Sequence, residues 1–330
     1  MNDLVSIIIP VFNGESYIDR LFSSLACQTY RPLEVIIIDD GSTDSSLKKL
    51  YLKVKDLKLT DFKVVILNQE NKGIAASRNL GIEISSGKYL MFHDQDDWLD
   101  DNCVEVLVKA MVSDDCDMVI SGYRSIDFKG KCRAECSLDE SLSWSKYRIT
   151  APWGRIFSKE TIEKKNIYFY DTKISEDLYF NILYICSVKK IKVISYIGYN
   201  WYYNKTSESH LNWSKADRNR NPIKMLNELQ KRIKSGNWNN EKEKTYFFAK
   251  YLIWYLLFTT RGSQKEVLKR NIHKSFNWLD QYYPDYKLRN FKDINYPSGE
   301  PFGIRACITF VILLKKLGLI EAALQFYRRI

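Results

Sequence analysis

Residues 33–44 of this 330-residue chain, LEVIIIDDGSTD, contain the pattern that decides the fold. A run rich in β-branched residues ends at two aspartates, and a glycine with serine, threonine and aspartate follows. The apolar run is typical of a buried strand, and the polar residues after it are typical of a turn and of a helix cap. The stretch therefore predicts a strand that leads through a polar loop into a helix.

The same strand-to-helix pattern repeats on both sides of this stretch. Further strands are predicted at 5–12, 62–67, 89–92, 118–122 and 192–196, and helices around 17–25, 75–84 and 178–186. Residues 124–150 show no regular pattern. The alternation predicts an α/β fold with a mostly parallel central sheet flanked by helices. Ligands of such sheets bind beyond the carboxyl ends of the strands, where polar loops follow residues 12, 38 and 92.

The character of the sequence changes near residue 212. Long segments with helical periodicity follow, with breaks at Gly236, Gly262 and 297–303. Residues 211–330 hold 23 Lys and Arg against 10 Asp and Glu. Their net charge of +13 (23 − 10) exceeds the +10 of the whole chain. We therefore expect two domains: a sheet-containing domain over 1–210 and a basic, mainly helical C-terminal domain over 211–330.

The cysteines and apolar segments argue against several other classes of protein. The seven cysteines lack the spacing of a zinc site, and the N-terminus lacks the pattern of a secretion signal. The longest apolar runs, 251–258 and 306–314, are much shorter than the ~20 residues that span a bilayer. These features predict a cytoplasmic protein with reduced thiols.

Residues 93–98, HDQDDW, place three aspartates directly after the predicted strand at 89–92. Mutual repulsion makes such a cluster costly, and a divalent cation would stabilise it because Mn²⁺ and Mg²⁺ prefer hard oxygen ligands. Alternation along an extended loop brings Asp94 and Asp96 to one side. We therefore expect these two to contact a metal or nucleotide, whereas Asp97, Asp100 and Asp101 are expected to cap the next helix.

Taken together, these segments resemble glycosyltransferase family 2. The resemblance rests on residues 5–13, 28–30, 34–44, 71–79 and 87–98 and extends over about 4–210. It implies a GT-A (Rossmann-like) fold and a UDP-sugar donor. It further implies inverting transfer of a hexose or N-acetylhexosamine to a sugar hydroxyl on a glycan, glycolipid or glycoprotein. Members of this type build bacterial surface polysaccharides or adhesin glycans.

The resemblance assigns donor and metal contacts to individual positions. The donor-binding residues would be Pro10, Phe12, Asn13, Glu15, Asp40, Lys72, Arg78, Asp94 and Gln95. Among them, Asp40 would accept a hydrogen bond from uracil, and Lys72 and Arg78 would contact the nucleotide or its phosphates. Asp94 and Asp96 would hold Mn²⁺ or Mg²⁺. His210 is either a third ligand or an exposed histidine.

Catalytic and acceptor-binding residues follow from the same resemblance. Glu176 and Asp177 match the family's acidic pair, and by position Asp177 is the general base; the alternative is that both cap a helix. Trp153 and Trp201 either stack on the acceptor sugar or belong to the core. His93 replaces the family's usual leucine, and it either hydrogen-bonds to the acidic cluster or faces the core.

The C-terminal segment 302–330 combines apolar residues with lysines and arginines. It either lies on the anionic inner face of the plasma membrane or packs on the catalytic domain or a second subunit as a homodimer. The expected acceptor is a lipid-linked or protein-linked glycan. The rival function is a non-catalytic module that binds nucleotide sugars, and no nucleic-acid partner is expected because no recognised motif accompanies the basic charge.

Overall fold

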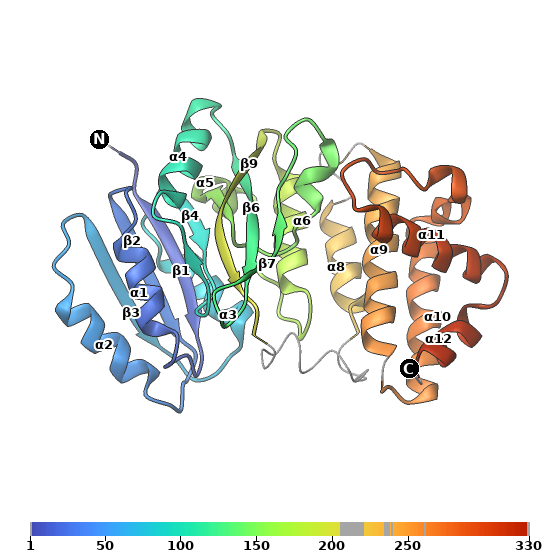
Figure 1. Ribbon diagram of the computed structural model, residues 1–330, viewed down its shortest axis with the longest axis horizontal. Coiled ribbons are helices and arrows are strands. Elements are labelled where there is room, and N and C mark those ends of the chain that lie inside the picture. Colours follow the sequence, from blue (N-terminus) through green and yellow to red (C-terminus); the bar gives the residue numbers. More distant parts are fainter. Residues whose placement is uncertain (1, 205–220, 234–237, 239, 261, 329–330) are drawn as a thin grey trace. The chain divides into compact units, whose positions relative to one another are not determined.

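The computed structural model describes residues 2–204, 221–233, 238, 240–260 and 262–328, shown in Figure 1. Contacts divide these residues into two compact units. The first comprises residues up to 141, 149–172 and 176–203, and the second comprises 142–148, 173–175 and the residues from 204 onward. The expected boundary at 210/211 falls outside the described residues. Two short segments from the middle of the chain group with the C-terminal unit.

Four parallel strands form one half of the sheet of the first unit. They are β1 (Val5–Val11), β2 (Leu33–Asp39), β3 (Phe62–Asn68) and β4 (Tyr89–Phe92), and they lie in the order β3-β2-β1-β4. Every residue of β1, β2 and β4 is buried. Strands covered on both faces need continuous apolar runs rather than alternation, which explains the pattern that predicted them.

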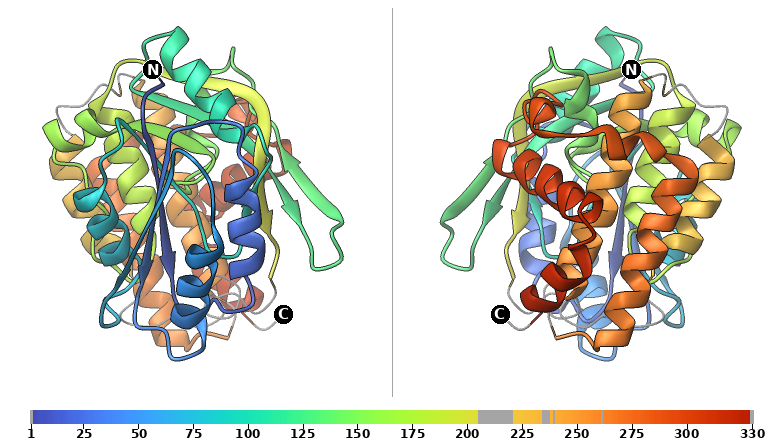
Figure 2. Two further views of the ribbon diagram at one scale, coloured as in Figure 1. Left: turned by 90° about the vertical axis from the view of Figure 1, so that its left-hand side faces the viewer. Right: turned by 90° about the vertical axis from the view of Figure 1, so that its right-hand side faces the viewer.

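The helices between these strands cover opposite faces of the sheet. The chain moves outward from β1 to β3 through α1 (Ile18–Ala26) and α2 (Ser46–Asp56), and it then returns through α3 (Ile74–Ile84) to β4 on the other side of β1. Because crossovers are right-handed, the return reverses the face, and α1 and α3 lie on opposite sides of the sheet (Figure 2). The loops after β1, β2 and β4 consequently meet at one edge.

The other half of the sheet is mixed. The order continues from β4 through β8 (Arg155–Ser158), β6 (Met118–Ile126) and β9 (Ile191–Tyr202) to β5 (Trp98–Leu99), and β7 (Cys132–Cys136) pairs with β6. β6 and β9 are parallel, whereas β8, β5 and β7 run antiparallel to their neighbours. The helices here are α4 (Cys103–Ser113), α5 (Lys159–Lys164) and α6 (Glu176–Ser187).

The predicted α/β architecture, a curled sheet flanked by helices with a mainly helical C-terminal region, is confirmed. The pattern did not predict β5, β7 or β8 as strands. β5 has only two residues, and the five residues of β7 are exposed or half-exposed and include two charged side chains. Neither strand shows the apolar run that identifies a buried strand.

The second unit is helical. Its elements are η1 (Ser143–Tyr147), α8 (Ile223–Ile233), α9 (Glu241–Thr260), α10 (Lys265–Tyr282), η2 (Pro284–Leu288), η3 (Phe291–Asp293), α11 (Phe302–Lys316) and α12 (Ile320–Tyr327). Its core contains Trp144 of η1, whose indole Nε1 donates to Glu300 Oε2 at 2.9 Å. Within the described ranges, no helix is both long and apolar enough to cross a bilayer.

One buried carboxylate fastens the amino ends of the central strands. Glu34 in β2 accepts hydrogen bonds from Ser6 Oγ (2.6 Å), from the backbone N–H and hydroxyl of Ser86 (2.8 and 2.6 Å) and from Lys63 Nζ (2.9 Å). Burial alone would raise its pKa, but these donors together lower it from the usual 4.5 to about 2.

The Glu34→Gln variant is expected to lose about 1–3 kcal/mol of unfolding free energy near pH 7, because it leaves donors without a carboxylate. A depressed pKa contributes stability above pH 4.5 that is lost as the pH falls toward 2. Urea unfolding from pH 7 to 3 should therefore show a weaker acid dependence in the variant. The exposed Glu83→Gln variant is the control, and an equal effect in both would contradict the assignment.

Candidate functional site

The loops after β1 and β2 are tied together by Asn13. Its backbone is left-handed (φ 48°), and its side-chain Oδ1 accepts from the Thr43 backbone N–H at 2.8 Å. Its own N–H donates to Ser42 Oγ at 2.9 Å. The Glu15 N–H adds another hydrogen bond between the same two loops by donating to Asp44 Oδ2 at 3.1 Å. The turn after β2 (residues 40–44) and the loop after β1 (residues 12–15) therefore form one polar surface, which we call the polar rim.

Gln95 ties the acidic loop to the same rim. Its side-chain amide bonds both backbone groups of Phe12, accepting from the N–H at 3.0 Å and donating to the carbonyl at 3.1 Å. This geometry requires glycine at position 14, because a Cβ there would lie 2.2 Å from Gln95 Oε1. The Phe12 ring remains 44% exposed, whereas Pro10 is buried within β1.

Asp40 is buried at the end of β2 and closes the turn that starts α3. Its Oδ1 accepts from Gln69 Nε2 (2.6 Å) and the Lys72 N–H (2.9 Å), and its Oδ2 accepts from the Gly73 N–H (2.8 Å). A carboxylate has about four acceptor positions, so about one stays available for a further donor. The Lys72 side chain is exposed.

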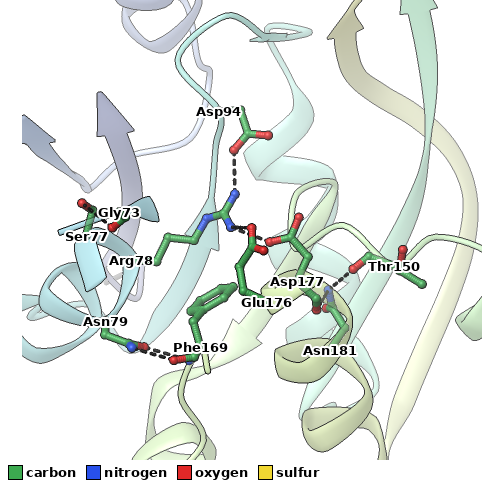
Figure 3. Close-up of polar contacts among 10 residues, drawn as sticks. All are labelled: Gly73, Ser77, Arg78, Asn79, Asp94, Thr150, Phe169, Glu176, Asp177 and Asn181. Atoms are coloured by element: carbon green, nitrogen blue, oxygen red, sulfur yellow. Dashed lines mark hydrogen bonds and ion pairs between the residues drawn. The ribbon is translucent and has the colours of Figure 1, made fainter. Parts of the chain in front are cut away.

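The Arg78 guanidinium, which extends from α3, forms ion pairs with three carboxylates from two distant parts of the chain (Figure 3). Its Nη2 donates to Asp94 Oδ1 at 2.9 Å, and its Nη1 lies 2.5 Å from Asp177 Oδ1 and 3.5 Å from Glu176 Oε1. The guanidinium is buried and its carbon lies 5.1 Å from the Phe169 ring centroid. The predicted general base and a predicted donor contact therefore share one cation.

The charges of this cluster influence one another strongly. Burial opposes the charge on Arg78, but Asp177, Asp94 and Glu176 together raise its pKa, so the guanidinium stays protonated. Burial raises the pKa of Asp177, and Arg78 opposes that rise. A carboxylate that is buried beside a fixed cation can both orient a hydroxyl and accept its proton.

Burial and a neighbouring carboxylate dominate the environment of Asp96. Burial and then the neighbouring Asp94 raise its pKa to about 6. Arg20 is near, but its Nη2 donates to the Asp96 backbone carbonyl at 2.5 Å rather than to the carboxylate. The donor chemistry of Asp94 and Asp96 therefore fits a hard divalent cation. The described residues contain no cluster of three or more such ligands.

The expectation that Asp97 and Asp100 cap α4 is wrong. The N-cap of that helix is Asn102, without a side-chain cap bond. Asp97 is buried and bound to β9, accepting from the Tyr199 hydroxyl (2.5 Å) and the Tyr202 N–H (2.7 Å). Asp100 accepts from Arg124 Nη2 and from Asn200 Nδ2, both at 2.9 Å. Both side chains fasten the acidic loop to strands instead, a long-range contact that local capping rules do not include.

His93 both faces the core and contacts the backbone of the acidic cluster. It is buried, its Nδ1 lies 2.7 Å from the Asp94 carbonyl oxygen, and burial lowers its pKa to about 4, which keeps the ring neutral. Trp153 is also buried, and its ring stacks on Tyr199 with centroids 4.6 Å apart. Trp201 is half-buried beside Tyr123. His210 lies outside the described residues.

The comparison with known families decides the identification. Residues 6–172, half of the chain, match the family model described as glycosyl transferase family 2. The chain belongs to glycosyltransferase family 2.

Individual relatives of this family 2 chain agree. It is 29% identical to the glycosyltransferase GlyA of Streptococcus pneumoniae over 210 residues, which cover 58% of this chain and 29% of GlyA. It is 26% identical to the uncharacterized glycosyltransferase EpsJ of Bacillus subtilis over 208 residues, 59% of each chain. The matched region therefore spans less than two thirds of either relative.

Two solved structures share the fold of this family 2 chain. Residues 1–349 of S. aureus TarS in complex with UDP-GlcNAc superpose with a TM-score of 0.62 at 17% identity, covering 98% of this chain and 91% of that one. The mannosyltransferase PcManGT from Pyrobaculum calidifontis, in complex with GDP-Man and Mn²⁺, superposes with a TM-score of 0.51 at 12% identity, covering 100% and 86%. At these identities the likeness concerns the fold.

Four residues that shape the site were not assigned roles from the sequence. Arg20 stacks between the rings of Trp98 and Tyr202, each centroid 4.4 Å away. Asn79 bonds both backbone groups of Phe169, at 2.8 Å each. Tyr199 holds Asp97. Such long-range partners have no local pattern, although Asn79 does lie inside the recognised motif.

The fourth such residue is Arg155, which lies in β8 and is fully buried. It donates from Nη2 to the Ile149 carbonyl, and its Nε and Nη1 have no partner in the described part of the chain. The adjoining Thr150 carbonyl accepts from Asn181 Nδ2, which also donates to the Asp177 carbonyl (Figure 3). Arg155 and Asn181 together fix the loop beside the first turn of α6.

The Tyr199→Phe variant tests whether Asp97 is a structural residue. Loss of the hydroxyl leaves a buried carboxylate with one donor fewer, which should lower the unfolding free energy by about 1–3 kcal/mol in urea titration. The control is Tyr196→Phe, whose hydroxyl bonds Asn102 Oδ1 at the exposed surface and should cost about 0.5 kcal/mol or less. Equal costs in the two variants would refute the structural role.

Proposed function

We propose that the chain is an inverting glycosyltransferase that moves a hexose or N-acetylhexosamine from a UDP-sugar to an acceptor sugar hydroxyl. The observation that supports this most directly is the shared contact of Arg78 with Asp94 and Asp177. A single displacement needs the donor diphosphate and the general base on opposite sides of one anomeric carbon. The guanidinium joins the loop proposed for the donor to the residue proposed as the base.

The donor side of the proposed reaction uses the polar rim. Phe12, Asn13, Glu15 and Gln95 would border the base and ribose, with the exposed Phe12 ring available for stacking. The remaining acceptor position of Asp40 would take the uracil N–H. The exposed ammonium of Lys72 and the guanidinium of Arg78 would bind phosphate oxygens and stabilise the charge that develops on the leaving diphosphate.

Asp94 and Asp96 would hold Mn²⁺ or Mg²⁺, consistent with the raised pKa of the Asp96 carboxylate. When bound, the cation would act as a Lewis acid on the diphosphate oxygens. His210 stays the proposed third protein ligand, and donor phosphates and water would complete the site, as is usual where a metal is shared with phosphates.

The chemical step would proceed at Asp177. Its carboxylate takes the proton of the acceptor hydroxyl while the hydroxyl oxygen attacks the anomeric carbon opposite the diphosphate. Contact with Arg78 aims the carboxylate, and the Asn181 bond to the Asp177 carbonyl fixes the backbone beneath it. Glu176, 3.5 Å from the same guanidinium, is the second proposed catalytic carboxylate.

The acceptor is proposed to be a lipid-linked or protein-linked glycan in the cytoplasm. Trp201 remains a proposed acceptor contact because its ring is partly exposed. Trp153 remains one with less support, because one face of its ring already stacks on Tyr199. The helical unit is proposed to act in acceptor or membrane contact or in dimer formation.

A donor screen tests the function itself. Incubation with UDP- and GDP-sugars and Mn²⁺ should release nucleoside diphosphate from a UDP-hexose or UDP-N-acetylhexosamine, and excess EDTA should stop the release. Release should be followed with a coupled assay, with boiled protein as the control. Tight binding of UDP without release from any donor would instead favour the non-catalytic module.

The Asp177→Asn variant tests the base. Asparagine keeps an oxygen for Arg78 but is not basic, so kcat should fall by ~10²–10⁴-fold while UDP affinity changes little. Steady-state kinetics and calorimetric UDP titration measure the two effects. Glu176→Gln is the matched control and should retain more activity, and near-normal turnover of Asp177→Asn would remove the assignment.

A further inference from the structure

The helix α11 is apolar on two opposite faces. One face is buried in the helical unit through Ile308, Thr309, Val311 and Ile312. A helix at the surface of a water-soluble unit normally has a polar outer face. The outer face of α11 is different, and the burial of the inner face does not explain it.

The outer face is an exposed apolar stripe. Phe302, Phe310 and Leu317 are 59%, 56% and 70% exposed. At about 100° per residue these three, with Ala306 and Leu313, fall within an arc of roughly 80°. On α12 and the turn before it, Leu319 and Phe326 are 50% and 68% exposed. We call Phe302, Phe310, Leu317, Leu319 and Phe326 the apolar stripe. Single exposed apolar residues are ordinary, but aligned ones indicate a contact surface.

The charge beside the apolar stripe is positive and unpaired with carboxylates. Residues 301–328 contain four cations, Arg305, Lys315, Lys316 and Arg328, and one acid, Glu321. In the described part of the chain none of the four forms an ion pair. Three donate to backbone carbonyls instead, of Asn295, Arg289 and Ser263, at 2.5, 2.9 and 3.0 Å. No carboxylate of the described residues therefore neutralises their charge, and Lys316 is exposed.

Two of these cations border a hollow. Lys315 and Lys316 line it together with Lys287, Tyr286 and Asp280. Lys287 is bound to Asp280 at 2.8 Å, so the charge of that pair is balanced within the protein. The ammonium groups of Lys315 and Lys316 are left, and Lys316 directly precedes Leu317 of the apolar stripe. At about 100° per residue Lys316 lies next to the apolar stripe, so an anionic group bound by Lys316 would lie beside an apolar group bound by the stripe.

We propose that the apolar stripe and its flanking cations form a docking surface for a lipid bilayer with anionic headgroups. The aromatic and leucine side chains would enter the boundary between headgroups and acyl chains, and the cations would contact the phosphates. This combination of apolar side chains and excess positive charge is that of a helix that lies in the plane of the interface.

Charge complementarity selects a bilayer over a second copy of the chain. A two-fold contact places the same patch on both subunits, so the four cations of one copy would face the four of the other. Glu321 alone cannot balance them. An anionic lipid surface, in contrast, gains from each cation within a Debye length. The surface goes beyond the proposed sugar transfer and is measured without any donor.

Co-sedimentation of the full chain with vesicles tests the proposal. Vesicles of phosphatidylcholine with added phosphatidylglycerol should sediment the protein, and pure phosphatidylcholine should sediment far less. The Phe310→Ser/Phe326→Ser variant and the Lys315→Gln/Lys316→Gln variant should each weaken partitioning by about tenfold or more. High salt should weaken the partitioning of the parent protein onto anionic vesicles, as the Lys315→Gln/Lys316→Gln substitution does. High salt should weaken the partitioning of the lysine variant less than that of the parent.

The control is Phe128→Ser, which removes a 73% exposed aromatic side chain from the other unit and should leave partitioning unchanged. Because all substituted side chains lie at the surface, thermal melting should confirm that each variant folds. The proposal would be overturned if the protein did not bind anionic vesicles, or if Phe128→Ser weakened partitioning as much as the other variants. It would also be overturned if light scattering showed that the parent is a dimer that does not bind lipid and that the Phe310→Ser/Phe326→Ser variant is a monomer.

Discussion

The organisation of the site depends on one buried guanidinium. Arg78 extends from α3, on the face of the sheet opposite α1, and reaches both the acidic loop after β4 and the first turn of α6. These two segments are about eighty residues apart in the chain, and each carries negative charge that would repel the other. Removing the cation would leave three half-buried carboxylates close together without compensation, which is more costly than losing an exposed ion pair.

The contacts of Arg78 would change when a donor binds. In the described structure Arg78 contacts Asp94 and Asp177 at once, so the proposed donor diphosphate would share the guanidinium with both carboxylates. The interaction between Asp177 and Arg78 would then be weaker, and the proton affinity of the Asp177 carboxylate would be higher. The side chain that brings these carboxylates together would therefore also raise the basicity of Asp177 in the proposed donor complex.

The sequence predicted the parallel strands and the polar loops because both depend on local pattern. Continuous apolar runs identify β1, β2 and β4, and turn residues follow each of them. The resemblance to the family directed attention to Arg78 and Asp177 but gave no sign that they touch. The antiparallel strands, Tyr199 with Asp97, and Arg20 between two rings arise from contacts across many residues, which single-sequence patterns do not encode. The capping assignment of Asp97 failed for this reason: a local rule was applied to a side chain that a distant strand had already engaged.

The contact between Gln95 and Phe12 limits which residues can change independently. While the amide of Gln95 spans the Phe12 backbone, position 14 has no room for even a methyl group. A related chain with alanine at position 14 would have to move the side chain at position 95 aside or shorten it, and its loop after β1 would then lose this attachment to the acidic loop. The two positions, 81 residues apart, should therefore vary together during evolution, and their joint identity would reveal whether a relative keeps the loop after β1 attached to the acidic loop after β4.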